Sequence, residues 1–193
     1  MGLTRVVHPI EQESYRILRS RVDTSALPPL TRAVLERVVH ASADLDYVTD
    51  LVLDESSLHA AVDALAGGAQ VAADVEMVAA GITSRQVVCG LKDAVVRGGE
   101  TRSAAGMRAA LDIVGHGAVW VVGCAPTALE ALLLLDARPA LVVGLPVGFV
   151  GAAESKAALR ASGLPAVSNT SEKGGSAVAA AAVNALLYVA ASA

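Results

Sequence analysis

Short runs of apolar residues recur along the chain, and each is bounded by residues that break regular structure. The clearest is Ala140 to Val143, an unbroken run between Pro139 and Gly144. A continuous run of this length, with β-branched side chains, is typical of a strand buried on both faces of a parallel sheet. The same pattern predicts strands at Ala69–Ala73, Gln86–Cys89, Ala118–Val122 and near Ala166, with a shorter apolar run at Leu51–Leu53.

Between these runs, apolar residues recur at helical spacing. One such segment has Thr31 as its predicted N-cap, after the break at Leu27–Leu30, and ends around His40. Further helices are predicted at Pro9–Val22, from Ser56 or Ser57 to Ala66, at Asp74–Ala80, Ser103–Val114 and Pro126–Leu135, from Ala152, and from Gly174 or Gly175. The alternation predicts a single three-layer α/β domain over 1–193, with a mainly parallel sheet and helices on both faces.

A glycine-rich stretch follows the strand at 140–143 and precedes the helix that begins at Ala152. Its turn-forming residues are Gly144, Pro146, Gly148 and Gly151. In an open α/β sheet, a strand–turn–helix corner lies at the carboxyl edge, where ligands bind. An ordinary connection between a strand and a helix explains the glycines equally well, so both interpretations stay open.

Composition narrows the class of protein. Hydrophobic residues make up 54% of the chain and the mean hydropathy is +0.54. Pro126, Glu130 and Pro146 interrupt the most apolar stretches, and the alanine-rich tail, which carries Asn184, is better interpreted as a buried helix, so no membrane span is expected. The first residues, which include His8 and Glu11, do not resemble a signal peptide, and we expect a cytoplasmic protein. A net charge of -4 and 3% aromatic residues argue against nucleic acid as a partner. Cys89 and Cys124 suggest neither a disulfide framework nor a metal site, and buried inert thiols are expected.

Among the four histidines, His40 is the candidate for chemistry. It ends an apolar helix and is followed by the polar residues Ser42, Asp44 and Asp46. Its position suits either a catalytic acid or a histidine that merely complements the helix dipole. The other three histidines look like turn or surface residues, and no histidine pair has the spacing of a metal site.

Three predicted helix starts offer groups that bind anions. Gly123 to Ala128 presents backbone amides and the Thr127 hydroxyl, and Thr101-Arg102-Ser103 presents a guanidinium beside hydroxyls. The third start lies at Gly174. Together they would suit a ligand with several carboxylates, whereas the glycine spacing of a nucleotide-binding loop is missing.

These segments also carry a resemblance to a known family. The chain resembles the precorrin-8X and cobalt-precorrin-8 methylmutases of cobalamin biosynthesis, most specifically in the run Leu145–Lys156. The other matching segments, in the same order along nearly the whole chain, are Val39–Asp46, Glu76–Ile82, Thr101–Ala105, Ala125–Leu129, Lys173–Ser176 and Asn184–Leu187.

The resemblance implies an α/β enzyme, commonly a homodimer, that moves a methyl group from C-11 to C-12 of a tetrapyrrole without an added cofactor or metal. It implies that His40 is the catalytic acid. The residues that it places around the substrate are Ser14, Thr83, Arg85, Arg102, Ser103, Thr127 and Lys173. A methyl shift on a conjugated ring requires a rigidly held macrocycle and one positioned proton donor, which agrees with these residue types.

Two positions depart from the family pattern. Cys124 stands where an asparagine is usual, and Glu172 stands where an arginine is common. The main rival to an enzyme is a non-catalytic corrinoid carrier, and a nucleotide-using α/β enzyme is a more distant one. The sequence leaves open whether the substrate contains cobalt. The alanine-rich last helix suggests close packing, either on a second subunit or within the chain's own core.

Overall fold

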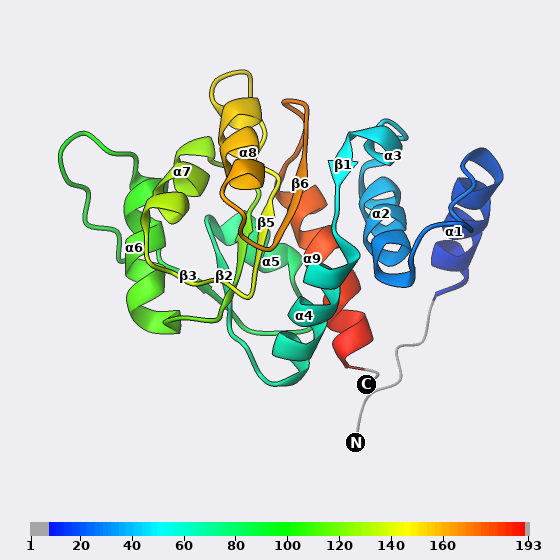
Figure 1. Cartoon of the computed structure of the whole chain (residues 1–193), viewed down its shortest axis with the longest axis horizontal. Coiled ribbons are helices and arrows are strands. Elements are labelled where there is room, and N and C mark those ends of the chain that lie inside the picture. The colour runs from blue at the N-terminus through cyan, green and yellow to red at the C-terminus, as the bar shows by residue number, and fades with distance from the viewer. Residues whose placement is uncertain (1–7, 192–193) are drawn as a thin grey trace.

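A six-stranded sheet forms the middle of the protein, in the strand order β1-β6-β5-β4-β2-β3 (Figure 1). The computed structural model describes residues 8–191, so residues 1–7 and 192–193 of the predicted domain lie outside the described residues. β1 pairs antiparallel with β6, and all the other pairs are parallel. The strands are β1 (Leu51–Val52), β2 (Val71–Ala73), β3 (Val87–Cys89), β4 (Val119–Val122), β5 (Leu141–Gly144) and β6 (Ala166–Asn169).

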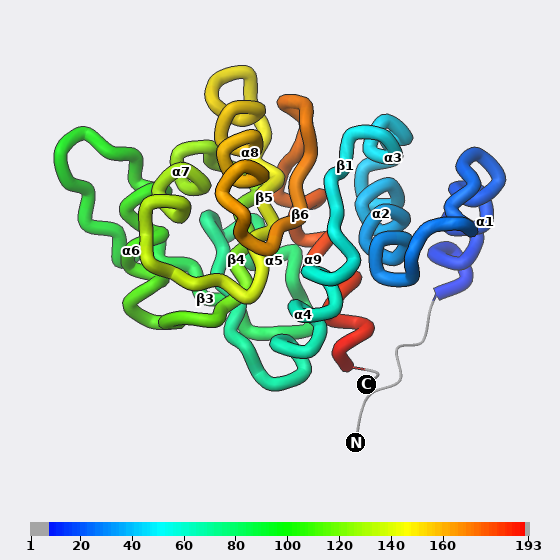
Figure 2. The backbone as a smooth tube through the Cα atoms, in the orientation of Figure 1, coloured from blue at the N-terminus to red at the C-terminus, as the bar shows by residue number. Residues whose placement is uncertain are grey.

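Helices cover both faces of the sheet, which confirms the predicted three-layer α/β fold (Figures 1 and 2). One face carries α2 (Pro29–Ser42), α4 (Glu55–Ala66), α5 (Glu76–Gly81) and α9 (Ser176–Ala190). The other carries α6 (Arg102–Val114), α7 (Pro126–Leu134) and α8 (Ala152–Ala161). α1 (Pro9–Arg21) packs on α2 outside these layers, and the short α3 (Tyr47–Asp50), which was not predicted, joins α2 to β1.

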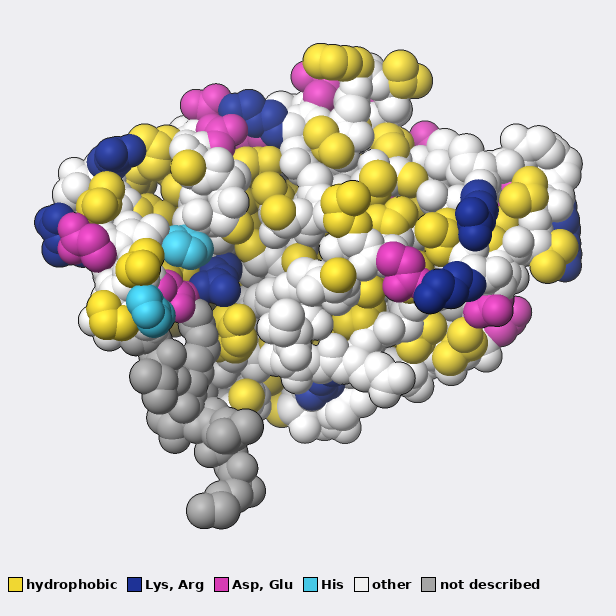
Figure 3. Space-filling view, turned by 180° about the vertical axis from the view of Figure 1, so that it is seen from behind, with side chains coloured by type: hydrophobic (Ala, Val, Ile, Leu, Met, Phe, Trp, Pro, Cys, Tyr) yellow, Lys and Arg dark blue, Asp and Glu magenta, His cyan; other side chains and the backbone are white. Residues whose placement is uncertain are grey.

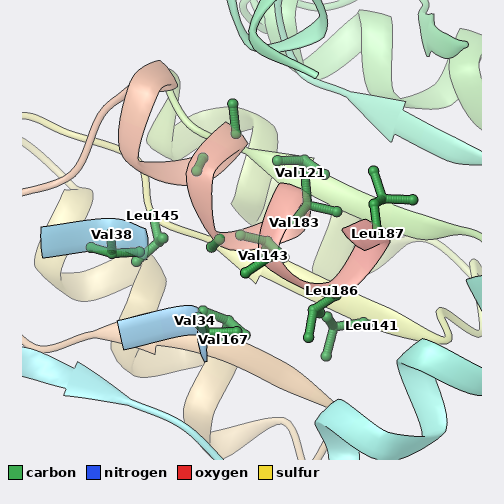
Figure 4. Packing of buried hydrophobic residues seen from close by; sticks show 14 of the residues in the cluster. Val34, Val38, Val121, Leu141, Val143, Leu145, Val167, Val183, Leu186 and Leu187 are labelled. Carbon is green, nitrogen blue, oxygen red and sulfur yellow. The ribbon is translucent and has the colours of Figure 1, made fainter. Parts of the chain in front are cut away.

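Each face of the sheet has its own apolar core, and the alternation of side chains along a strand divides them. In β4, Val119 and Val121 belong to the core beneath α2 and α9, whereas Trp120 and Val122 belong to the core beneath α6 and α7. Figure 4 shows residues of β5, α2 and α9 meeting in the first core. Burial on both sides explains why β2, β4 and β5 were recognisable as uninterrupted apolar runs.

The predicted start of α2 is too late by nearly one turn, because Pro28 and not Thr31 is the N-cap residue. The helix begins at Pro29, and Thr31 lies within its first turn instead of capping it. The Thr31 amide and hydroxyl both donate to Glu55 Oε2 at 2.7 Å, and the Leu30 amide donates to Glu55 Oε1 at 2.9 Å. The unpaired amides at this helix start are therefore satisfied by a carboxylate of α4, a tertiary contact that local sequence does not reveal.

The predicted N-cap of α4 is also corrected. Asp54 caps the helix, because its carboxylate accepts a hydrogen bond from the Ser57 amide at 2.8 Å. The hydroxyls of Ser56 and Ser57, the predicted caps, donate to the same carboxylate at 2.6 and 2.7 Å. An aspartate serves as an N-cap as well as a serine does, so composition alone could not choose between neighbours.

The last helix is buried within its own chain. Every residue of α9 from Val178 to Leu187 is buried, and the helix packs against α2, α4 and α5. A Cβ added at Gly81 would lie 2.7 Å from the Ala180 Cβ, which shows how closely α5 approaches this helix. The alanines therefore serve the core, the second of the two interpretations. Between residues 8 and 191, no helix is long and apolar enough to span a bilayer.

Candidate active site

His40 lies in the last turn of α2 and is half-buried against α1. Its Nδ1 is 2.7 Å from the Ser14 hydroxyl oxygen of α1. The Tyr15 ring stacks on the imidazole, with ring centroids 5.0 Å apart and an interplanar angle of 14°. Ala43 then ends the helix in a left-handed conformation with φ 53°. The ring is thus oriented from two sides, at the helix end whose dipole favours a protonated imidazole.

A cavity of about 320 Å³ opens beside His40, between α1 and the end of α2. Most of its walls are apolar, and its lining residues are Ile10, Glu13, Ser14, Ile17, Leu18, Arg21, Val39, His40, Ala43 and Leu45. Cavities of about 360 and 460 Å³ lie elsewhere, but neither contains His40. Volume alone does not indicate which of these three cavities binds a ligand. The His40 cavity is the one of the three that combines apolar walls with an oriented imidazole. It suits the edge of a flat apolar ligand.

Charged groups dock α1, which carries Ser14, onto α2. Arg19 donates to Glu36 at 2.7 Å, and Arg37 donates to Glu11 at 2.5 Å. Burial alone would raise the pKa of Glu36, but hydrogen bonds from two arginines and a threonine lower it to about 2. Leu18 is the one residue of α1 that is fully buried. The wall opposite α2 is therefore held mainly by ion pairs.

Lys173, one of the predicted substrate-binding residues, lies at the corner that follows His40. Its Nζ is 2.7 Å from Asp44 Oδ2 and 2.5 Å from Asp46 Oδ2. The hydrogen bonds that Lys173 donates to these two carboxylates raise its pKa, and the lysine lowers the pKa of Asp44. Lys173 thus ties the segment before α9 to the turn after α2, and two carboxylates already balance its charge.

A second group of predicted residues lies at the starts of α6 and α7. The Thr101 and Thr127 hydroxyl oxygens are 2.7 Å apart, and Thr101 caps α6 by accepting from the Ala104 amide at 3.2 Å. Arg102 is exposed and its Nε donates to the Leu91 carbonyl at 3.3 Å. Ser103 is half-buried in the first turn of α6. These groups present hydroxyls and a guanidinium at the surface.

The predicted anion site at the start of α7 is occupied by a carboxylate of the chain itself. Asp74, the first residue of the helix predicted at 74–80, instead follows β2 and precedes α5, which begins at Glu76. It accepts from the amides of Gly123, Cys124 and Ala125 at 3.1, 2.8 and 2.9 Å. Burial raises the pKa of Asp74, although the three amides oppose that shift. The thiol of Cys124, expected to be buried, is exposed. Asp74 reaches this turn because β2 and β4 are parallel neighbours whose carboxyl ends meet, a pairing that the sequence does not reveal.

The remaining predicted residues, Thr83 and Arg85, lie at the amino ends of β2 and β3, opposite the carboxyl edge of the sheet. Arg85 precedes β3 and donates to the carbonyls of Ala69 and Leu65 at 2.8 and 2.9 Å. Thr83 is exposed just after α5. Within one chain the structure thus brings Ser14 to His40 and Lys173 to the corner that follows it. The residues at the starts of α6 and α7 form a second group, and Thr83 and Arg85 lie apart from both groups. Figure 1 shows α1 and α2 at one end of the molecule and α6 at the other.

The fold is that of an α/β protein, and its His40 cavity places an oriented imidazole beside apolar walls. Comparison with known proteins identifies the particular family. Residues 9–189 match the family described as precorrin-8X methylmutase. The chain therefore belongs to the precorrin-8X methylmutase family, as its resemblance suggested, and the predicted class, a methylmutase of cobalamin biosynthesis, is confirmed.

Individual relatives match over nearly their full length. The precorrin-8X methylmutase of Pseudomonas aeruginosa is 41% identical, over 92% of this chain and 93% of that protein. The cobalt-precorrin-8 methylmutase of Salmonella typhimurium is 40% identical, over 93% of each. The crystal structure of a precorrin-8x methyl mutase from Thermus thermophilus superposes with a TM-score of 0.84 at 34% identity, covering 95% of this chain and 96% of that one.

Proposed function

We propose that this protein moves a methyl group from C-11 to C-12 of precorrin-8X or of its cobalt form, and that His40 donates the proton. The observation that carries the proposal is the oriented imidazole beside an apolar cavity in a chain of this family. A methyl shift within a conjugated ring requires a rigidly held macrocycle and a proton donor that favours the rearranged tautomer. The helix end around His40 favours the protonated ring that such a donor needs.

The carboxylate arms of a tetrapyrrole call for cationic and hydroxyl groups. We propose Arg102, Ser103 and Thr127 for this role, together with Thr83, Arg85 and Lys173, and Ser14 as the residue that orients His40. Arg102 is the exposed guanidinium of this set, and a guanidinium pairs with a carboxylate through two parallel hydrogen bonds.

A single chain presents these groups at separate ends, and its His40 cavity of about 320 Å³ is near the lower limit of small-molecule sites. We therefore propose a homodimer in which two copies together enclose the macrocycle. Phe149 and Val150, in the turn before α8, are 94% and 88% exposed, and Leu134 of α7 is 88% exposed. Contiguous exposed apolar patches mark interaction surfaces, and we propose that the second copy covers these side chains. Figure 3 shows further hydrophobic side chains on the rear face of the molecule.

Sedimentation at micromolar concentration tests the dimer. The wild-type protein should sediment as a dimer, and a Phe149→Glu, Val150→Glu double variant should shift toward monomer. A wild-type protein that sediments only as a monomer would rule the assembly out. We also propose a cytoplasmic location, which suits the two cysteines, neither of which forms a disulfide.

The proton-donor role is tested by His40→Asn beside the control His116→Asn, which alters an exposed histidine in a turn. Turnover of metal-free and cobalt substrates is followed by the yellow-to-red absorbance change. His40→Asn should lower turnover by roughly 10² to 10⁴-fold while binding persists, because positioned acid–base catalysis contributes about that much. Normal turnover by His40→Asn would refute the assignment.

A further inference from the structure

Lys156, the last residue of the run Leu145–Lys156, is fully buried on α8 and has no role in the site described above. Its Nζ donates to Asn169 Oδ1 at 2.8 Å and to the backbone carbonyls of Ser171 and Lys173 at 2.5 and 2.7 Å. Each of the three ammonium protons therefore has an oxygen acceptor. Two of these acceptors belong to the segment 170–175, which connects β6 to α9.

A carboxylate binds the same segment from the other side through hydrogen bonds. Asp50, at the end of α3, accepts from the Asn169 side-chain amide at 2.7 Å and from the backbone amides of Thr170 and Ser171 at 2.9 Å each. Burial opposes ionisation of Asp50, but these hydrogen bonds lower its pKa. Asn169 thus links the buried ammonium to the buried carboxylate, and the backbone between them has partners on both sides.

The far end of the segment reaches the His40 corner. Lys173 pairs with Asp44 and Asp46, which follow the end of α2. The Gly175 amide donates to the Leu145 carbonyl at 2.9 Å, and a Cβ added at Gly174 would lie 2.3 Å from that oxygen. The segment is therefore closely packed between the turn at 145–150 and the turn after His40.

We propose that Lys156 is a positioning residue for substrate binding by this methylmutase, because its ammonium fixes the segment 170–175 and, through Lys173, the turn that follows His40. This inference rests on the proposed function. Lys156 itself is sealed from any substrate, so it acts through the segment alone. A methionine would fill much the same space without a buried charge, and a buried charge is tolerated only where its hydrogen bonds are complete. The retained charge is what directs the two backbone carbonyls inward.

The test compares Lys156→Met with Lys92→Met, which makes the same change at an exposed lysine paired with Glu76. Dissociation constants for metal-free precorrin-8X and its cobalt form are measured by absorbance titration, and turnover is measured at saturation. Lys156→Met should weaken binding roughly tenfold or more, since small misplacements of positioning groups have effects of that order or larger. Turnover at saturating substrate should stay within about twofold of wild type, because the loss concerns binding. Lys92→Met should match the wild type in both.

Hydrogen exchange provides a readout that does not depend on turnover. Amides in 170–175 should exchange faster in Lys156→Met than in Lys92→Met, while amides of β4 keep wild-type rates. Unchanged exchange in this segment, or equal binding by both variants, would overturn the proposal. If the wild type binds both tetrapyrroles but converts neither, the proposed catalytic function is wrong. The binding comparison between Lys156→Met and Lys92→Met still decides the role of Lys156.

Ser171→Ala is a milder second variant in case Lys156→Met does not fold. It removes only the hydroxyl that donates to Asp50 at 2.7 Å and that accepts from the Lys173 amide at 3.2 Å. Faster exchange in 170–175 with binding weakened by about twofold or more supports the positioning role. Faster exchange with unchanged binding would show that the segment does not serve the substrate, which overturns it.

Discussion

Two loops at the carboxyl edge of the sheet each contact a buried charge, and the two charges have opposite signs, Asp74 at one loop and Lys156 at the other. Asp74 is 1% exposed and accepts hydrogen bonds from three consecutive backbone amides just before α7. Lys156 is 0% exposed and donates hydrogen bonds to three oxygens, two of which belong to the segment 170–175. Burial raises the pKa of Asp74 and lowers that of Lys156 to about 8, so desolvation disfavours both ions.

The two loops differ in what they leave for a substrate. Asp74 occupies amides that would otherwise attract an external carboxylate, so its loop is closed to anions. The loop above Lys156 instead continues through Lys173 to the corner that follows His40. Internal charges thus shape both loops, and recognition of a carboxylate is left to surface groups such as Arg102.

The largest expected effect on stability comes from Asp74→Ala, which leaves three amides without their acceptor. Unfolding in urea should show a loss of about 2–4 kcal/mol, since hydrogen bonds to a charged group are worth about 1.5–3 kcal/mol each and part of that is offset by removing a buried charge. Asp74→Asn, which keeps one acceptor oxygen, should lose less. The exposed Asp93→Ala serves as the control. Wild-type stability in Asp74→Ala would mean that these hydrogen bonds add little.

A smaller effect should appear as opposite slopes in the dependence of stability on pH. The pKa of Lys156 is about 8 in the folded protein instead of 10.5, so between these values the unfolded chain binds more protons and the unfolding free energy rises with pH. The pKa of Asp74 is raised above 3.8, so just above that pH the folded protein binds more protons and stability falls as pH rises.

Urea unfolding over a pH series, taken as the difference between wild type and variant, isolates each group. The rise in unfolding free energy between pH 8 and 10.5 should be missing in Lys156→Met. The fall in unfolding free energy just above pH 3.8 should be missing in Asp74→Asn. Difference curves that are flat in both variants would show that neither charge is disfavoured by burial, and the comparison between the two loops would lose its energetic basis.

Ser14→Ala should affect catalysis more than stability, in contrast to the two loop residues. Losing one hydrogen bond of about 0.5–1.5 kcal/mol to the His40 ring corresponds to roughly 2- to 12-fold in turnover. Ser20→Ala removes a hydroxyl from the same helix, where it donates only to the Ile17 carbonyl, and should leave turnover unchanged. Equal turnover in both variants would show that Ser14 does not orient the imidazole.

The smallest effect is expected for Glu172→Arg, on the exposed side of the loop above Lys156. Replacing a carboxylate by a guanidinium should tighten binding of an anionic tetrapyrrole by about fivefold at most, because exposed charges interact weakly. The gain should shrink with salt, since screening acts over roughly 10 Å at 0.1 M. Titrations at low and high salt measure it. Unchanged affinity at low salt would place Glu172 away from the bound substrate.

Most of the fold could be predicted from the sequence because it depends on local patterns. Strands buried on both faces appear as unbroken apolar runs, as at Leu141–Gly144, and helices appear through their apolar spacing. The N-cap of α4 was missed because Asp54, Ser56 and Ser57 are all suitable cap residues. The start of α2 was missed because a distant residue decides the local geometry there. Glu55 satisfies the start of α2, and no pattern around Thr31 indicates that contact.

The candidate site was less predictable than the fold, because it depends on contacts between residues that are distant in the sequence. His40 was found because it stands at a helix end beside polar residues, and the family resemblance added Ser14, which the structure places 2.7 Å from it. The role of Asp74 depends on the pairing of β2 with β4, and the burial of Lys156 depends on how α8 packs on β6. Neither residue differs in its immediate sequence from an ordinary surface charge.

The most direct test of the central claim is to follow one turnover of a tetrapyrrole that carries an isotope-labelled methyl group at C-11. The wild-type protein is mixed in excess with this substrate, and the labelled carbon is located by nuclear magnetic resonance as the colour changes. The account predicts that the label appears at C-12 of the same molecule. A label that remains at C-11 on a tightly bound, spectrally unchanged tetrapyrrole would contradict it and would identify the protein as a corrinoid carrier.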